Sequence, residues 1–287
     1  MTKTNYISAS VALLAALLAV SFLVLALPKV ASSQVVVTEK EIDSNGKLGS
    51  IWVNNQLGCQ VDHSGNGAGG EFYNGALTTV EATDDYVTCG TWIGLLGGAT
   101  FGVEYGELTP VSQSLTGKGT KRKPFKITTV GDVGDNTGLR VTQVDSYRTS
   151  QDQYRTTVTI KNTTNSSIDA IVYRAGDCLL NFTDGSTRGK LVGSNTPACF
   201  STDQAKPEEL SLIPISSGSS YHAGRYVEIF DDGLNIQDPF ENTIINDKDP
   251  ISGNDIDTDS YVGLSWEVSI GAGNKVTRSN YTKITIP

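Results

Sequence analysis

The segment Tyr261-Val-Gly-Leu-Ser-Trp-Glu-Val-Ser-Ile270 decides the fold class of this chain. Every second residue from Val262 to Ile270 is apolar, and the residues between them are smaller or polar. In an extended strand successive side chains point to opposite faces, so this period of two places one face on a core and the other toward solvent. The segment therefore predicts an antiparallel strand that buries Trp266.

The same period of two recurs along the chain. Residues 154–161 alternate in this way and stop at a turn-rich cluster, Asn162-Thr-Thr-Asn-Ser-Ser167. Further strands are predicted at residues 35–38, 51–53, 78–82, 125–130, 139–144, 168–173, 219–230 and 283–286. Beyond the N-terminal segment, no long stretch carries a stripe with the helical period of 3.6 residues. The sequence predicts an all-β protein, an antiparallel β-sandwich of one large or two packed units, after an N-terminal signal or anchor helix.

The N-terminal segment has the pattern of an export signal. Lys3 precedes an apolar run at residues 11–27, and the small residues Ala31 and Ser33 follow it. This order is typical of a signal peptide, here residues 1–33. The run is also just long enough for an uncleaved anchor, in which case residues 9–28 are the only membrane contact. Both interpretations predict a secreted or cell-surface protein.

Composition limits the classes of partner. The 287 residues include 31 acidic and 22 basic side chains, which gives a net charge of −9. An acidic surface repels phosphate backbones, so we expect no nucleic-acid partner. A hydrophobic content of 38% is sufficient for a folded core.

The four cysteines predict two disulfide bonds in an exported chain. Four cysteines allow three connectivities. Pairing neighbours along the chain avoids crossing half the protein, so we expect Cys59–Cys89 and Cys178–Cys199. No Cys-x-x-Cys spacing favours a metal site or thiol catalysis.

A basic cluster at residues 117–124 stands out in this acidic chain. We interpret it as a basic loop between an N-terminal β-rich portion, residues 34–116, and a C-terminal β-sandwich, residues 125–287. It is either a solvated loop or a contact for an acidic neighbour, such as residues 231–259 of another copy.

Residues 231–259 contain nine aspartates and glutamates and a single lysine. Carboxylates at every second position can turn toward a hard cation, and Ca²⁺ takes six to eight oxygen ligands. The candidate calcium ligands are Asp247, Asp249, Asp255, Asp257 and Asp259. A solvated acidic loop is the alternative, and no other cofactor is expected.

The motif Tyr173-Arg-Ala-Gly-Asp-Cys178, followed by Gly263-Leu-Ser-Trp266, carries a resemblance. Residues 119–282 resemble an uncharacterised β-sandwich region of secreted and surface proteins of actinobacteria and other prokaryotes. The resemblance implies a β-sandwich at the cell surface and no established activity. Such proteins tend to carry a cysteine after a Pro-Phe step, whereas Pro239-Phe240 is followed here by Glu241.

Catalytic patterns are weak. His63 and His222 are the only histidines, and Ser265 lacks the second glycine of a nucleophile elbow. Three tryptophans are few for a carbohydrate groove. We therefore predict no catalytic residue and no enzymatic activity.

Four Asn-x-Ser/Thr sequons are glycosylation candidates, at Asn162, Asn165, Asn181 and Asn280. Glycans attach to exposed asparagines, so the sequons predict that these four positions face solvent.

The leading functional interpretation is a non-enzymatic, exported structural or adhesion protein, such as a calcium-stabilised filament or surface-layer subunit. Its partners would be other surface proteins or copies of itself, joined by strand exchange. The first alternative is a carbohydrate- or ligand-binding module, because sandwiches host binding sites readily. The second alternative is a secreted hydrolase.

Overall fold

The computed structural model describes residues 37–44, 46–63, 89–102, 105–178, 180, 187–203, 207–225, 237–246, 248, 251–254, 256 and 260–285. All regular secondary structure in these ranges is β-strand, which confirms the all-β prediction. Among the same residues, no helix is long and apolar enough to cross a membrane. The signal or anchor at residues 1–33 and the strand predicted at residues 78–82 lie outside the described residues.

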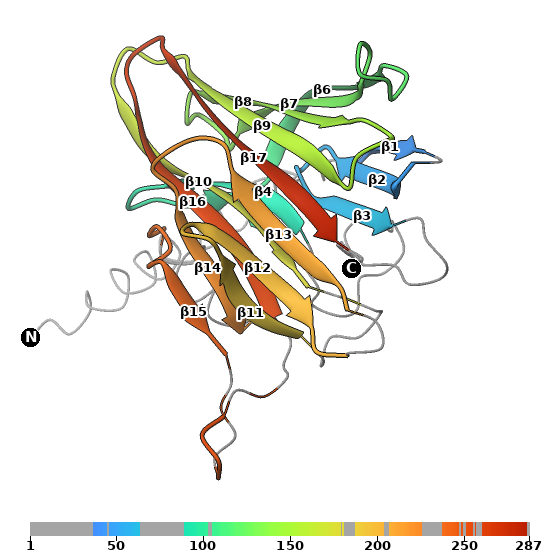
Figure 1. The fold of residues 1–287 in the computed structure, drawn as a ribbon. Helices are drawn as coiled ribbons and strands as arrows, with labels where there is room; N and C mark the ends of the chain where they lie inside the picture. Colours follow the sequence, from blue (N-terminus) through green and yellow to red (C-terminus); the bar gives the residue numbers. More distant parts are fainter. Residues whose placement is uncertain are drawn as a thin grey trace, which may run out of the picture. The chain divides into compact units, whose positions relative to one another are not determined.

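The largest sheet has eight antiparallel strands (Figure 1). Their spatial order is β11 (Thr187–Val192), β12 (Thr196–Ser201), β13 (Glu209–Pro214), β17 (Lys275–Thr285), β9 (Gln153–Asn162), β8 (Leu139–Tyr147), β7 (Phe125–Val133) and β6 (Leu108–Thr116). Every other described strand precedes β17 in the chain, yet β17 lies between β13 and β9 in the interior of the sheet. Strands β6 to β9 follow one another as hairpins.

A six-stranded sheet packs on this sheet. Its order is β15 (Thr243–Ile245), β14 (Ser220–Arg225), β16 (Ser260–Ile270), β10 (Ile168–Asp177), β4 (Cys89–Leu95) and β5 (Thr100–Phe101), with β14 and β15 the only parallel pair. A smaller sheet contains β1 (Glu39–Asp43), β2 (Leu48–Asn54) and β3 (Cys59–His63). The three sheets share one apolar core, to which Ile51, Ile160 and Leu264 each contribute from a different sheet.

The strand predicted at residues 261–270 forms β16, with Trp266 buried. Its second face is less exposed than the alternation predicts. Only Glu267 and Ser269 are exposed, whereas Tyr261 and Ser265 are buried. The reason is that Phe240 covers this face, and its backbone N–H donates to Ser265 Oγ over 2.9 Å. A solvent face predicted from one strand is buried here by a distant segment.

Both expected disulfide bonds are present, and each connects two sheets. Cys59–Cys89 joins β3 to β4. Cys178, directly after β10, is bonded to Cys199 in β12. Disulfide bonds persist in oxidising surroundings, so the two bridges agree with an extracellular location.

The basic loop at residues 117–124 is a hairpin turn within one sheet. Lys118 N–H donates to Lys123 O over 2.9 Å, and the flanking strands β6 and β7 pair with each other. Strand β4 likewise pairs with β10, so the portions predicted at residues 34–116 and 125–287 share both larger sheets. Residues 35–287 form one compact unit, and the loop does not separate two domains.

Candidate functional site

Positive charge gathers on one part of the eight-stranded sheet. Residues 117–163 and 275–285, which form β7, β8, β9, β17 and their turns, contain twelve lysines and arginines and four aspartates, a net charge of +8. One of these aspartates, Asp145, points into the core, and one of the cations, Arg278, is on the inward side of β17 opposite the buried Val158. The rest of the chain has ten cationic and 27 acidic residues, a net charge of −17. We call the outward side of these four strands and their turns the basic face.

The strand register builds a depression at one end of the basic face. Ser146, Arg155 and Tyr281 lie side by side on β8, β9 and β17. The depression has a volume of about 310 Å³, and we call it the basic depression. Its lining residues are Lys121, Pro124, Ser146, Arg148, Gln151, Gln153, Arg155 and Tyr281.

Three cations and no carboxylate line the basic depression. Arg155 is oriented by a hydrogen bond from its Nη2 to Ser279 Oγ, over 3.3 Å. A nearby carboxylate, Asp152, lies 3.8 Å from the ammonium of Lys283. Arginine and lysine donate charge-assisted hydrogen bonds to carboxylates, sulfates and phosphates. The depression can therefore bind an anionic group beside an aromatic ring.

Two turns that line the basic depression are tied to each other. Thr149 N–H donates to Gly119 O over 3.1 Å, which joins the β8–β9 turn to the β6–β7 turn. Gly119 has a φ of +71°, and a Cβ there would lie 2.6 Å from both Phe125 and Thr149. Only glycine fits this conformation and this space. Lys121 and Arg148 are thus carried by turns held in fixed positions.

A second depression lies at the opposite end of the same strands. Its volume is about 390 Å³, and we call it the turn depression. Its lining residues are Thr109, Asp132, Gly134, Asp135, Asn136, Gly138, Leu139, Arg140 and Thr163. In contrast to the basic depression, it presents two carboxylates, an amide and hydroxyls beside a single guanidinium, that of Arg140.

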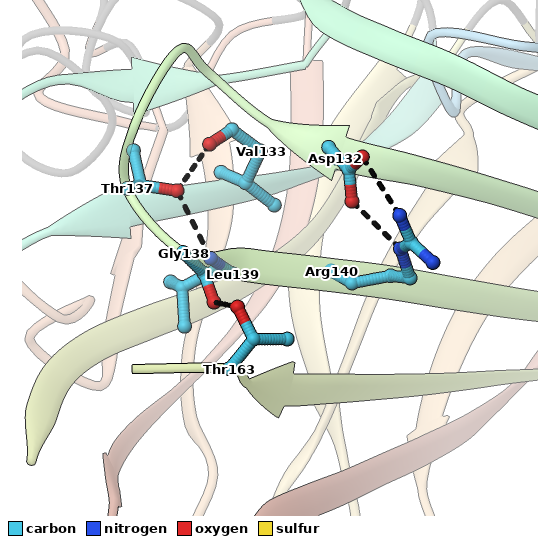
Figure 2. Close-up of polar contacts among 7 residues, drawn as sticks. All are labelled: Asp132, Val133, Thr137, Gly138, Leu139, Arg140 and Thr163. Carbon is cyan, nitrogen blue, oxygen red and sulfur yellow. Dashed lines mark hydrogen bonds and ion pairs between the residues drawn. The ribbon is translucent and has the colours of Figure 1, made fainter. Parts of the chain in front are cut away.

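An ion pair fixes the side chains of the turn depression. Arg140 donates from Nε and Nη2 to the two carboxylate oxygens of Asp132, over 2.7 and 2.9 Å (Figure 2). These hydrogen bonds lower the pKa of the Asp132 carboxyl, so it stays ionised at neutral pH. The strands β7 and β8 place the two residues directly opposite each other.

The β7–β8 turn that carries Asp135 is also held in place. Thr137 Oγ1 donates to Val133 O and accepts from Leu139 N–H over 3.1 Å (Figure 2). Thr163 Oγ1 donates to Gly138 O over 2.8 Å. Fixed side chains bind a ligand without the entropic cost of ordering them first.

The predicted calcium site is not tested. Asp247, Asp249, Asp255, Asp257 and Asp259 all lie outside the described residues. Within the part of the chain that the structure describes, no group of three or more histidines, cysteines, aspartates and glutamates is arranged to hold a metal ion.

His222 is a packed core residue. It is 2% exposed, its ring lies 6.1 Å from the ring of Phe240, and its Nδ1 lies 3.4 Å from Thr243 Oγ1. Ser265 accepts its hydrogen bond from Phe240 N–H in mid-strand. The side chain of His63 lies outside the described residues.

Two sequons are buried, and the prediction that they face solvent is wrong. Asn162 is fully buried, and its Nδ2 donates to Ser166 O and Ile270 O over 2.7 and 2.8 Å. Asn280 is 2% exposed in the middle of β17. Asn165 is exposed, as expected, and Asn181 lies outside the described residues.

Sequence reasoning missed the basic face as a site. Arg155 and Tyr281 meet only because β9 pairs with β17, and these two partners are 126 positions apart along the chain. The sequence did contain one local indication of this face. Soon after the basic loop, Arg140, Arg155 and Lys161 occupy polar positions in strands whose residues alternate between apolar and polar.

Comparisons with known proteins do not assign the chain to a family. No family model matches it, and no curated protein matches it. The resemblance based on Tyr173–Cys178 and Gly263–Trp266 therefore stays a prediction.

Several solved structures show a distant similarity. A putative aldose 1-epimerase from Escherichia coli is 12% identical, with coverage of 88% of this chain and 100% of that one and a TM-score of 0.44. The GH36 α-galactosidase AgaA of Geobacillus stearothermophilus is 8% identical, with coverage of 87% and 41% and a TM-score of 0.45. A putative kojibiose phosphorylase from the human microbiome is 11% identical, with coverage of 81% and 29% and a TM-score of 0.44.

The prediction of a protein without enzymatic activity finds no support in these matches: the three proteins are named as carbohydrate-processing enzymes. The chain spans only 29% of the phosphorylase and 41% of the galactosidase. At identities of 8 to 12%, the matches assign no activity, substrate or residue to this chain. Neither they nor the described residues support the predicted adhesive or filament-forming role.

Proposed function

We propose that this protein binds an acidic carbohydrate outside the cell and that the basic face is its binding surface. The observation that carries the proposal is the basic depression, which Lys121, Arg148, Arg155 and Tyr281 line together in a chain with a net charge of −9.

The chemistry of the lining suits a sugar that carries a carboxylate or a sulfate. Arginine forms paired hydrogen bonds with such groups. The Tyr281 ring offers an apolar surface to a sugar face, and the amides of Gln151 and Gln153 can donate to or accept from hydroxyls. A volume of about 310 Å³ accommodates one small unit of a ligand.

An acidic carbohydrate fits better than a nucleic acid. The two disulfide bonds agree with an extracellular location, away from the nucleic acids of the cell interior. The lining also contains a single aromatic side chain, Tyr281, whereas single-stranded nucleic acids are bound by stacking successive bases on several aromatic side chains.

The test measures binding of polygalacturonate, with neutral dextran and a single-stranded oligonucleotide as comparison ligands, at the same ionic strength. We expect polygalacturonate to bind, with an affinity that falls as salt is added. Binding releases counterions from the charged ligand, and a higher salt concentration opposes that release. We expect no binding of dextran and weaker binding of the oligonucleotide. An oligonucleotide that binds as tightly as polygalacturonate would assign the face to nucleic acid and refute the proposal.

Two double variants separate a specific site from general attraction. Arg148→Gln with Arg155→Gln removes two cations that line the depression, and the affinity should fall about tenfold or more, since each charge-assisted hydrogen bond is worth about 1.5 kcal/mol or more. Arg122→Gln with Lys123→Gln removes the same charge from the neighbouring turn, and the affinity should fall by less than about threefold. Equal losses in both variants would contradict a defined site.

A further inference from the structure

The two depressions lie on the same face of the same strand, at opposite ends. Ser146 lines the basic depression and Arg140 lines the turn depression, and both are on β8. Six positions separate them, an even number, so the two side chains point to the same side. At about 3.3 Å per residue, the two positions are about 20 Å apart.

Short side chains cover the surface between the depressions. Thr142, Thr159 and Thr277 form a row across β8, β9 and β17, and Thr157 lies in the adjacent row. Thr159 Oγ1 and Thr277 Oγ1 are hydrogen-bonded to each other over 2.9 Å. This row presents methyl and hydroxyl groups and no large side chain, so an extended ligand can lie across it.

The two ends of this path differ in chemistry. The basic depression offers cations to an acidic unit. The turn depression offers the carboxylate of Asp135 and the amide of Asn136, which accept hydrogen bonds from hydroxyls or amides, whereas the carboxylate of Asp132 is paired with Arg140. With that pair balanced, Asp135 gives the lining an excess of negative charge, so the second end favours a neutral unit over an acidic one.

We propose that the ligand is a polysaccharide that contains both acidic and neutral units and occupies the two depressions at once. This inference rests on the proposed function and adds the class and the minimum length of the ligand. A single sugar unit is far shorter than about 20 Å, and a chain that reaches both ends gains the second contact as an intramolecular step. The affinity should therefore rise steeply once the ligand spans both ends.

The test compares hyaluronan fragments of two and eight sugar units, because this polymer alternates an acidic and a neutral sugar. We expect the octasaccharide to bind about 100-fold more tightly than the disaccharide, beyond the few-fold gain from its larger number of binding positions. Isothermal titration at fixed ionic strength gives both dissociation constants.

A pair of charge-neutral variants locates the second contact. Asp132→Asn with Arg140→Gln alters the turn depression, and the affinity for the octasaccharide should fall at least tenfold while that for the disaccharide is unchanged. Lys190→Gln with Glu209→Gln removes another, partly exposed ion pair, away from the path between the two depressions, and should change neither value.

The outcomes distinguish this inference from the proposed function. Equal affinities for the two fragments, or no effect of the Asp132 and Arg140 changes on the octasaccharide, would overturn the spanning ligand and leave the basic depression in place. Failure of both hyaluronan fragments and of polygalacturonate to bind would refute the proposed function itself.

Discussion

The guanidinium of Arg174 donates a hydrogen bond from Nη2 to the hydroxyl of Tyr154, over 2.6 Å, in the interior between the two larger sheets. Arg174 is on β10 and Tyr154 is on β9, and both are fully buried. The same Nη2 lies 3.0 Å from Cys59 Sγ, in the smaller sheet. One buried side chain therefore contacts residues from all three sheets.

Removal of the tyrosine hydroxyl tests this contact. Tyr154→Phe leaves the buried guanidinium without its oxygen acceptor, and we expect the free energy of unfolding to fall by about 2 kcal/mol. Arg174→Met removes the buried charge together with its need for partners, so it should cost less than Tyr154→Phe. Urea titrations at neutral pH measure both changes, and the reverse order of the two costs would contradict the argument.

The buried carboxyl of Asp145 should make stability depend on pH. Burial raises the pKa of this group above the ordinary value of 3.8, against the opposing effects of Arg174, Thr156 and Gln143. The folded state keeps its proton where the unfolded chain has released it, so this contribution to stability is complete below about pH 3.8 and is lost as pH rises. Asp145→Asn should therefore gain stability relative to the wild type as pH is raised from 3 to 7.

Asp132→Asn is the matched control for that experiment. The pKa of Asp132 is lowered by its hydrogen bonds from Arg140, so its contribution is present above the ordinary value and is lost as pH falls. The difference in the free energy of unfolding between this variant and the wild type should therefore change with pH in the opposite direction. This difference should be small, because the pair is exposed to solvent. Slopes of the same sign in both variants would show that the assignment of Asp145 is wrong.

The bridge between Cys178 and Cys199 should contribute a large part of the stability. Its loop has a sequence separation of 21 residues, which corresponds to about 3 kcal/mol of chain entropy in the unfolded state. Cys178→Ala with Cys199→Ala should lower the free energy of unfolding by that amount. A wild type whose melting temperature is unchanged by a reducing agent, with the thiols shown to be free by mass spectrometry, would disprove this.

Gly189 marks a close approach of two backbones. A Cβ at this position would lie 2.3 Å from Gly224 N and 2.5 Å from the carbonyl carbon of Ala223, so β11 and β14 would have to move apart. Gly189→Ala should cost about 2 kcal/mol or more. Gly131→Ala, where the nearest atom is 3.4 Å away, is the control and should cost less than about 1 kcal/mol. Thermal unfolding of the two variants compares them.

Glycosylation should distinguish the sequons by burial. In a host that attaches N-linked glycans, Asn165 should be occupied and Asn162 should not, because both N–H groups of the Asn162 amide are donated to backbone carbonyls. Asn162→Gln should also destabilise the protein, whereas Asn165→Gln should have no effect. Glycopeptide mass spectrometry that finds a glycan on Asn162 of folded protein would contradict the structure.

The sequence predicted the features that depend on neighbouring residues. The alternation in residues 154–161 and 261–270 identified β9 and β16, since a strand's two faces are determined by its own side chains. The cysteine pairs were predictable because each bridge closes a short loop.

Features that depend on long-range pairing were not predictable. The burial of Ser265 requires Phe240, and the basic depression requires Tyr281 beside Arg155. The sequon at Asn162 gives no indication of its burial, because the Asn-x-Thr motif concerns three residues and the burial comes from Ile270 and its surroundings. The overall charge of −9 also concealed a local excess of cations.

The position of β17 has a consequence for how the chain acquires its structure. The pairs β13–β17 and β17–β9 both require residues 275–285, so the eight-stranded sheet stays in two halves until that segment has been synthesised. Hairpins such as β7–β8 can form earlier, but the shared core cannot close. The native sheet therefore cannot close before residues 275–285 are available, and until then the halves expose apolar surface to which chaperones can bind.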